Sequence, residues 1–482
     1  MNFTPLPPLS LSCDVRFPEA ADSPHDHVSR WSETYVSLPA VVVVPQTEAD
    51  IVTALQYAVD NGLRVVVAGG GHAPFVPVTA KTLYLDMRQF KSIILKDIES
   101  TVTIGGGVLT GELFSSLTAR GFYTTVPNSN AVGVVGAVLG SGNGPFNSLH
   151  GFMADNVDGI RIITFANGKI EVRDIHISTK NAEEHALLSA ICGGGHGLGV
   201  IVTMTLHVYR VTELSLDNND HIWQRRIVFP GSAIRDAATL FASLLPIKGP
   251  VSAALLFGRS PPGTPRPGSP IVMIIGSFFG PATAAEASTF ATDLLASDYT
   301  ANAALAVTES VPMAKINEST APFNAHGGSK TLDATFLREL DVDRIVALFE
   351  QFNALTEGRP ELYMSYTLIA AWDNTVAEEL GSSEARKNNF IVTRDRSILQ
   401  LNMVWSSKTS TNSEQEAKAH MRKMKEISMR GETGPLVSFA NNLAFPASLS
   451  DYYPGHKVEG LLAVKKLWDP AGLFWSPSMD IE

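Results

Sequence analysis

A β-branched strand that runs directly into three glycines and a histidine constrains this chain more than any other stretch. Residues 65–67 are valines, which favour a buried strand, and residues 69–72 then read Gly-Gly-Gly-His. Consecutive glycines permit a sharp turn and a close approach of the backbone to a ligand, because no Cβ stands in the way. The imidazole of His72 can act as a nucleophile, a proton carrier or a metal ligand. Taken alone, the stretch also fits a tight turn with an incidental histidine.

Length and composition describe a globular protein of two domains. The chain has 482 residues, more than one hydrophobic core usually accommodates. The net charge of −11 argues against a nucleic-acid partner, because such partners require clustered lysine and arginine. Two cysteines, Cys13 and Cys192, exclude a disulfide framework and a multi-cysteine metal site. No obligate protein partner is evident from the sequence.

The N-terminal residues lack the basic region of a usual signal peptide, and their apolar run is broken by prolines. No stretch approaches the roughly 20 apolar residues of a membrane span. The expected location is the cytoplasm, with secretion left open.

Three further glycine clusters follow in the N-terminal part. Residues 105–107 end a strand predicted at 101–104, residues 133–144 carry five glycines, and residues 193–199 lead into an extended run. Backbone N–H groups of such loops can line a phosphate or a carbonyl-rich ring system. Residues 140–144 superficially match a Rossmann fingerprint. We reject this interpretation because the third glycine is missing at the required spacing and a proline follows.

Local signals in the same part alternate between helix and strand. Thr47-x-x-Asp50 predicts a helix N-terminus, and Asn61-Gly62 predicts the end of that helix. Asn167-Gly168 predicts a hairpin turn between strands at 159–165 and 169–172. The N-terminal part is therefore expected to be a mixed α+β domain.

The middle of the chain predicts strands backed by helices, which gives a sheet with one covered and one free face. The strands are expected near 251–257, 271–277, 361–370 and 399–405, and the helices near 284–296, 341–355 and 413–429. Because side chains alternate along a strand, Tyr363 and Tyr366 should point to opposite faces. Candidate pocket residues on these strands are Tyr363, Tyr366, Trp372, Asn402 and Trp405. Simple core packing is the alternative for each of them.

Several motifs occur together in an order that resembles a known family. They are Gly70-Gly71-His72, Gly133-Val134-Val135-Gly136 followed by Gly140, Gly142 and Gly144, then residues 151–157, Ala166-Asn167-Gly168 and residues 193–203. With them the chain resembles the FAD-binding domain of the vanillyl-alcohol-oxidase-type, or PCMH-type, flavoproteins, in the berberine-bridge-enzyme-like branch found in fungi. Near the C-terminus, Asp451-Tyr452-Tyr453, Leu461-x-x-Val464-Lys465 and Asp469-Pro470-x-x-Leu473-Phe474 resemble the segment that closes this flavin domain.

This resemblance implies an α+β, two-domain flavoprotein. Residues 1–208 and 437–482 would together form the PCMH-type FAD-binding domain. Residues 209–436 would form an inserted α+β substrate domain, an antiparallel sheet backed by helices whose free face lies over the flavin.

The resemblance also implies FAD as the cofactor. His72 stands where the family's histidine bonds covalently to the flavin 8α-methyl carbon. A second bond in many members is made by a cysteine whose position is Ser129 here, so a single covalent link is predicted. Ala68 stands where the family often has an arginine, which leaves open which cation offsets negative charge on reduced flavin. The predicted cofactor-binding residues are Gly69, Gly70, Gly71, His72, Ala73, Pro127, Ser129, Val132, Gly133, Gly136, Gly140, Gly142, Asn143, Gly144, Gly199, Val200 and Ile201.

A core histidine and a metal ligand are the alternatives for His72. No metal site is predicted, since neither His150 nor His196 has the partner spacing of a metal-binding motif.

The function implied by the resemblance is that of a FAD-dependent oxidase. Such an enzyme transfers hydride from a small organic molecule, here expected to be a secondary metabolite, to flavin N5, and dioxygen reoxidises the flavin. The predicted catalytic residues are Tyr363, Tyr366 and Asn441.

One departure from the family pattern disfavours a sugar-oxidase activity. The family's Tyr-x-Asn-Tyr falls on residues 439–442, where Asn441 matches but Phe439 and Asn442 replace the tyrosines. An amide cannot remove an alcohol proton near neutral pH. Two alternatives stay open, a flavin-containing isomerase or cyclase of secondary metabolism without net redox change, and a non-catalytic ligand-binding protein.

Overall fold

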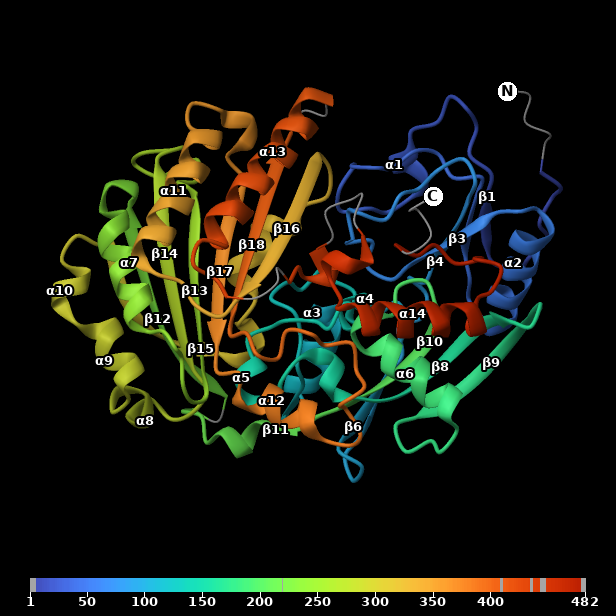
Figure 1. The fold of residues 1–482 in the computed structure, drawn as a ribbon, viewed down its shortest axis with the longest axis horizontal. Helices are drawn as coiled ribbons and strands as arrows, with labels where there is room; N and C mark the ends of the chain where they lie inside the picture. Colours follow the sequence, from blue (N-terminus) through green and yellow to red (C-terminus); the bar gives the residue numbers. More distant parts are fainter. Residues whose placement is uncertain (1–5, 219, 408–410, 434–436, 443–447, 478–482) are drawn as a thin grey trace.

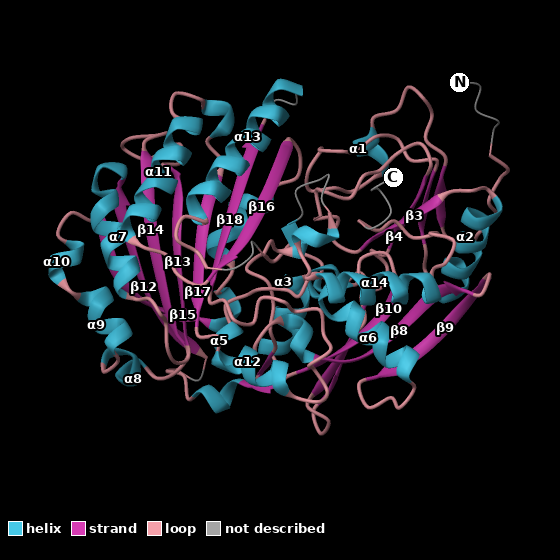
Figure 2. Ribbon diagram, in the orientation of Figure 1, coloured by secondary structure: helices cyan, strands magenta, loops and turns pink. Residues whose placement is uncertain are grey.

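The computed structural model describes residues 6–218, 220–407, 411–433, 437–442 and 448–477. Its strands gather in two regions that lie beside each other (Figures 1 and 2). One region contains a four-stranded and a five-stranded sheet, and the other a seven-stranded sheet covered by helices.

The four-stranded sheet presents the Gly-Gly-Gly-His stretch at the end of a buried strand. Its strand order is β1 (Asp14–Arg16), β2 (Val41–Val44), β4 (Thr82–Asp86) and β3 (Arg64–Ala68). Strands β2, β4 and β3 are parallel, and helix α2 (Glu48–Asp60) connects β2 to β3. The predicted start of α2 is confirmed, because Thr47 and Asp50 form a reciprocal capping box.

The five-stranded sheet is antiparallel and has the order β5 (Ile93–Lys96), β6 (Thr101–Gly105), β10 (Val200–His207), β8 (Val157–Ala166) and β9 (Lys169–His176). The predicted hairpin between β8 and β9 is confirmed. Asn167 and Gly168 both have positive φ, at 53° and 72°, as a two-residue type I′ turn requires.

Five further helices pack against one another or against strands of the N-terminal region. They are α3 (Thr110–Thr118), α4 (Val134–Leu139), α5 (Asn147–His150), α6 (Ala182–Gly194) and α12 (Thr375–Ser382). A small ribbon pairs β7 (Phe122–Tyr123) with β11 (Tyr209–Arg210), and α1 (Pro24–His27) precedes β2.

The C-terminal segment returns to the N-terminal sheets. Helix α14 (Gly455–Trp468) packs on α6 and β8, and Figure 1 shows it in red among blue and teal elements. After α14, the Leu473 carbonyl accepts a hydrogen bond of 2.8 Å from the backbone of Val65 in β3. The buried Lys465 ammonium donates to Asp469 Oδ2 at 2.6 Å and to the Phe474 carbonyl at 3.0 Å.

The seven-stranded sheet is antiparallel throughout and confirms the expected sheet backed by helices. Its order is β15 (Leu305–Pro312), β12 (His221–Pro230), β14 (Pro270–Phe278), β13 (Val251–Arg259), β17 (Tyr366–Trp372), β18 (Ile398–Ser406) and β16 (Ser329–Leu337). One face carries α7 (Ile234–Ser243), α8 (Ala282–Glu286), α9 (Thr289–Leu295), α10 (Ser297–Thr300), α11 (Val342–Thr356) and α13 (Thr411–Ser428) (Figure 1). Ile227, Leu255, Ile274 and Ile369 point into that helix-covered core.

The opposite face of the sheet turns toward the N-terminal region. Phe336, Trp372 and Leu399 from this face join the hydrophobic core of the N-terminal region, so the two regions share buried contacts. Other residues of the same face line a cavity. The domain boundaries at 208/209 and 436/437 stay a prediction.

Two expected elements differ from the structure. Strand β17 begins at Tyr366 and not near residue 361, because residues Pro360–Leu362 form a 3₁₀ turn. Tyr363 therefore lies before the strand, and strand alternation does not set its direction. The helix expected at 284–296 is divided into α8 and α9, because Ser288 caps the second helix through a bond from the Ala291 backbone.

Candidate functional site

A cavity of about 410 Å³ lies between the glycine-rich loops and the free face of the seven-stranded sheet. Its walls come from segments that are far apart in the sequence. They are residues 67–76, loop 127–145, strands β12, β13, β14, β17 and β18, residues 316–324 and residues 439–442.

The three glycines before His72 are required by loop packing as well as by the turn. A Cβ on Gly70 would lie 2.6 Å from the backbone nitrogen of Gly133, and one on Gly71 would lie 2.2 Å from the Ser29 carbonyl oxygen. Gly71 also has a positive φ of 62°. The glycine clusters at residues 69–71 and 133–144 thus lie backbone against backbone, and their loops form one wall of the cavity.

His72 is held on this wall with one ring nitrogen unpaired. Its imidazole stacks on Trp31, with ring centroids 4.3 Å apart and an interplanar angle of 13°. Nε2 is buried and has no hydrogen-bond partner among the described residues. Burial, with the nearby charges of His326 and Lys330, lowers the pKa of His72 to about 3. The imidazole is therefore neutral at pH 7.

Residues 28–35, which we term the N-terminal arm, supply two site residues that sequence reasoning missed. The backbone N–H of Trp31 donates to the Gly71 carbonyl at 3.1 Å. The Arg30 guanidinium lies in the cavity wall and donates to the carbonyls of Ala73 and Val76. The arm has no periodic pattern and no motif, so no sequence signal placed it at the site.

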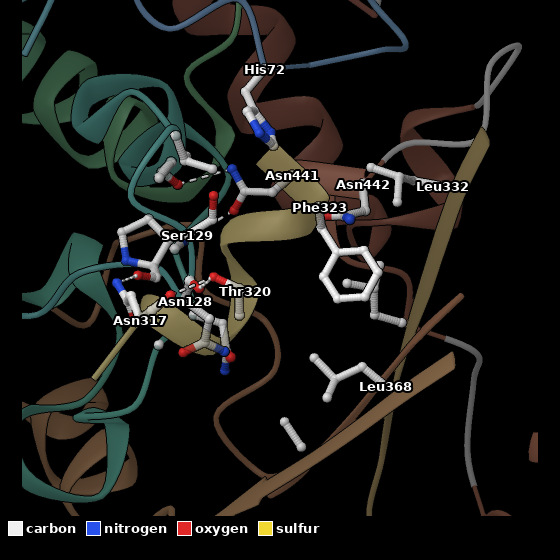
Figure 3. A pocket seen from close by; sticks show the side chains of 18 of the residues that line it. His72, Asn128, Ser129, Asn317, Thr320, Phe323, Leu332, Leu368, Asn441 and Asn442 are labelled. Carbon is white, nitrogen blue, oxygen red and sulfur yellow. Dashed lines mark hydrogen bonds between the residues drawn. The ribbon is translucent and has the colours of Figure 1, made fainter. Parts of the chain in front are cut away.

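Residues 313–328, the crossing segment, were also missed. This segment joins β15 to β16, the two opposite edges of the sheet, and therefore crosses all seven strands. Figure 3 shows how it meets loop 127–130. Asn317 donates to the Pro127 carbonyl at 2.9 Å, Thr320 donates to the Asn128 carbonyl at 2.7 Å, and Ser129 donates to Asn324 Oδ1 at 2.6 Å.

Asn441 holds the glycine-rich stretch 133–144 in place. Its amide nitrogen donates to the Ala137 carbonyl at 2.9 Å, and its Oδ1 accepts from the Gly142 backbone at 3.2 Å. A Cβ on Gly140 would lie 2.5 Å from the Asn441 side chain, which explains the glycine there. Asn441 lines the cavity, but its hydrogen-bonding groups are directed to the backbone.

Tyr366 is the predicted catalytic tyrosine that reaches the cavity. Its ring packs edge-on against Phe323 of the crossing segment, with centroids 4.6 Å apart. Its hydroxyl has no hydrogen-bond partner among the described residues. Burial raises the pKa of Tyr366, so the phenol is protonated at neutral pH.

The electrostatic character of the wall is weakly positive. Among the described lining residues, Arg30, His72, His196 and Tyr366 are the ionisable groups, and none is a carboxylate. Burial lowers the pKa of His196 to about 4, so this second histidine is also neutral. Like His72, His196 has a buried Nε2 without a described partner.

Most residues predicted to bind the cofactor line the cavity together. They are Gly69, Gly70, Gly71, His72, Ala73, Pro127, Ser129, Val132, Gly133, Gly136, Gly142, Asn143 and Gly144, and Trp372 of the pocket candidates lies with them.

The others lie outside the lining. Gly140 is behind the wall against Asn441, and Gly199, Val200 and Ile201 are at the start of β10, where the Ile201 carbonyl lies close to Gly106.

Three of the aromatic and polar pocket candidates are elsewhere. The Tyr363 ring lies against Gly268, with the guanidinium of Arg259 6.0 Å from its centroid. Asn402 points to the helix-covered face, where Thr367 donates to it at 3.1 Å. Trp405 contacts the ammonium of Lys330, 4.1 Å from its ring centroid.

Comparisons with known proteins agree with this geometry. Residues 39–173 match a family described as a FAD binding domain. The chain is 25% identical to the FAD-linked oxidoreductase hasG of Aspergillus fumigatus, over 93% of each chain. It is 29% identical to the (R)-6-hydroxynicotine oxidase of Paenarthrobacter nicotinovorans, over 42% of this chain and 43% of that enzyme.

Solved structures share the fold over almost the whole chain. The berberine bridge enzyme-like protein 1 of Physcomitrella patens superposes with a TM-score of 0.77 at 19% identity, covering 97% of this chain and 96% of that one. The 6-hydroxy-D-nicotine oxidase from Arthrobacter nicotinovorans gives a TM-score of 0.75 at 17% identity, covering 98% and 99%. Within the described residues, no helix is long and apolar enough to cross a membrane. The chain therefore contains a FAD binding domain, is similar over nearly its whole length to a fungal FAD-linked oxidoreductase, and has the fold of the berberine bridge enzyme-like flavoproteins.

Proposed function

We propose that the protein is an oxidase that uses FAD to oxidise a small, uncharged organic molecule, expected to be a secondary metabolite. One observation carries this proposal. A single cavity joins the glycine-rich loops and the unpaired ring nitrogen of His72 to the free face of the seven-stranded sheet. A cofactor held on the first wall and a substrate held on the second would share that space.

The residues present fit FAD. The loops around Gly70 and Gly142 carry no Cβ that would block the approach of a planar ring or a phosphate, and their backbones line the cavity. When bound, FAD supplies a hydride acceptor that dioxygen can reoxidise.

His72 is the proposed site of a single covalent attachment. Its ring is neutral at pH 7, its Nε2 has no described partner, and the Trp31 stack fixes its plane. The residue that would make a second link is Ser129, whose hydroxyl is engaged with Asn324.

The sheet face is suited to a neutral substrate. Leu256, Met273 and Leu368 give it an apolar floor that excludes water, and the described lining offers no carboxylate to hold a cation. Tyr366 is protonated and faces the cavity, so it would donate a hydrogen bond to a substrate oxygen rather than remove a proton.

A flavin-containing isomerase or cyclase is the second candidate. Phe439 lines the cavity where the family has a tyrosine, and Asn442 lines it where the family has the tyrosine base. The absence of a carboxylate from the described lining favours this candidate further, because net oxidation of an alcohol needs a proton acceptor. Anaerobic addition of the substrate separates the two, since oxidation bleaches the flavin absorption and an isomerisation leaves it unchanged.

The covalent proposal is tested by the absorption spectrum of purified protein before and after acid precipitation. We expect yellow colour to stay in the wild-type pellet and to wash out of the His72→Ala pellet. His196→Ala is the matched control, because it removes another neutral, buried histidine of the same cavity and should keep its colour. Colour that washes out of the wild-type pellet would reject the covalent link but retain FAD, and a colourless wild-type protein would favour the non-catalytic binding protein.

A further inference from the structure

Two buried cations flank His72, and no carboxylate forms an ion pair with either among the described residues. They are Arg30, which is only 5% exposed, and Lys330, which is fully buried. A buried charge without compensation is costly, so each needs partners.

The partners of Lys330 all come from the protein. Its ammonium donates to the Trp31 carbonyl at 2.5 Å and to the Gly327 carbonyl. The ring centroids of Trp31 and Trp405 lie 4.7 Å and 4.1 Å from its Nζ. Lys330 is not part of the cavity wall, and its role is to join the N-terminal arm to β16.

Arg30 is different, because its donors are only partly used. A guanidinium carries five N–H donors in a rigid fork. The hydrogen bonds of Arg30 to backbone carbonyls both come from Nη2, to Ala73 and Val76, while Nε is buried without a partner among the described residues. The Tyr84 hydroxyl also contacts the guanidinium as a hydrogen-bond partner, but burial raises the pKa of that phenol to about 12, so Tyr84 offers no anion at neutral pH.

The position of Arg30 directs its charge to the cavity. Arg30 lies in the wall beside residues 69–73, where glycine backbone groups are suited to an anion. It is the permanent positive charge of the described lining, and no carboxylate of that lining competes for it.

We propose that Arg30 is an anion-recognition residue of the cofactor site, whose guanidinium binds a negatively charged oxygen of FAD. This inference rests on the proposed function. Two parts of FAD offer such an oxygen, namely the pyrophosphate and the reduced, anionic flavin ring. The alternative is that Arg30 is only a clamp that joins the N-terminal arm to residues 73–76.

The test compares flavins that do and do not carry phosphate. Arg30→Met and Arg30→Lys are made in a His72→Ala background, where flavin exchanges freely, and Kd values for FAD and riboflavin are measured by titration calorimetry. Lys330→Met is the matched control. It also removes a buried cation next to Trp31, but the hydrogen-bond partners of this cation are all supplied by the protein. Riboflavin binding also reports whether each variant is folded.

If Arg30 binds the pyrophosphate, Arg30→Met raises the Kd for FAD about 10- to 100-fold and leaves the Kd for riboflavin unchanged. If it binds the anionic ring, oxidised FAD keeps its Kd and reduced FAD is bound about 10- to 100-fold more weakly. The flavin midpoint potential then falls by about 30 to 60 mV, at 29.6 mV per tenfold change for two electrons. Lys330→Met is expected to shift neither the ratio of the two Kd values nor the potential.

Equal losses for FAD and riboflavin with an unchanged potential would show a clamp and overturn the inference. Should Arg30→Met fail to fold, Arg30→Lys decides, because it keeps the charge and loses the fork. If Arg30 binds the pyrophosphate, we expect Arg30→Lys to bind FAD about 3- to 10-fold more weakly and riboflavin normally; if it binds the anionic ring, we expect a lower flavin midpoint potential. An unchanged Kd for FAD together with an unchanged potential would overturn the inference. A folded His72→Ala parent that binds neither flavin would instead reject the proposed function itself.

Discussion

Tyr366 faces the cavity in surroundings that determine the direction in which its phenol can transfer a proton. Burial raises its pKa, and the described residues that line the cavity include no carboxylate that could accept its proton. A phenol that stays protonated serves as a donor to a substrate oxygen and not as a base.

We therefore expect Tyr366→Phe to lower kcat/KM about tenfold, the effect of one lost hydrogen bond, without loss of bound FAD. The measurement is kcat/KM between pH 6 and 10 for a substrate found by peroxide detection. The wild type should show no alkaline inflection from this phenol, since its raised pKa places ionisation above the range. Tyr363→Phe is the control, because Tyr363 lies outside the cavity beside Arg259. An equal loss in both variants would argue against a specific role for Tyr366.

Single residues also show which parts of the site could be predicted from the sequence and which could not. The Gly-Gly-Gly-His stretch could be singled out because glycines and histidine carry an intrinsic conformational and chemical meaning. Arg30 and Trp31 carry no such signal, since an arginine and a tryptophan in an irregular segment are usually unrelated to a site. Only the fold brings them to His72.

At the scale of elements, local signals predicted local structure well. The capping box at Thr47 and the Asn167-Gly168 hairpin were predictable because each depends on residues only a few positions apart. The crossing segment was not predictable, because its course is determined by which strands form the two edges of the sheet. Strand order in a seven-stranded antiparallel sheet is a property of long-range pairing.

The crossing segment gives a prediction for Asn317, which is 3% exposed and bonds to the Pro127 carbonyl. Asn317→Ala leaves that buried carbonyl unpaired, so we expect a loss of about 1–3 kcal/mol in the free energy of unfolding. Chemical denaturation measures the loss. The control is Asn302→Ala, which removes an exposed asparagine bonded to Asp236 and should change stability by less than about 0.5 kcal/mol. A similar small change for Asn317→Ala would mean that the segment is not fastened to loop 127–130 through this side chain.

At the scale of the whole molecule, buried neutral histidines make stability depend on pH. Burial lowers the pKa of His72 and His150 to about 3, and of His196 and His420 to about 4. Each binds a proton more readily in the unfolded chain, where its pKa is about 6.5. Protonation therefore favours unfolding, and stability falls as the pH drops from about 6.5 toward 3 to 4. Asp155 and Asp333, whose pKa values burial raises, oppose this trend, because their contribution is lost as the pH rises.

We expect Tm to fall steeply between pH 6.5 and pH 4.5, with each histidine contributing up to about 1.4 kcal/mol per pH unit. Thermal melts across this range measure the slope. His420→Gln should make the slope shallower by the contribution of one proton, because it removes one of the four histidines. His420 does not line the cavity, so the substitution leaves the cavity wall intact. A Tm that does not change over this range would contradict the neutral state of these histidines.

The contacts of the N-terminal arm have a consequence for the order in which the molecule is made. Trp31 bonds to the Phe323 carbonyl across 292 sequence positions, and Lys330 reaches back to Trp31 across 299. During translation at about 5–20 residues per second, the arm leaves the ribosome tens of seconds before these partners exist. Helix α14, which closes the flavin side, is synthesised later still. The nascent chain therefore lacks part of this cavity wall until residues 323–330 have been synthesised, and a ligand that needs the whole wall can bind only after that point.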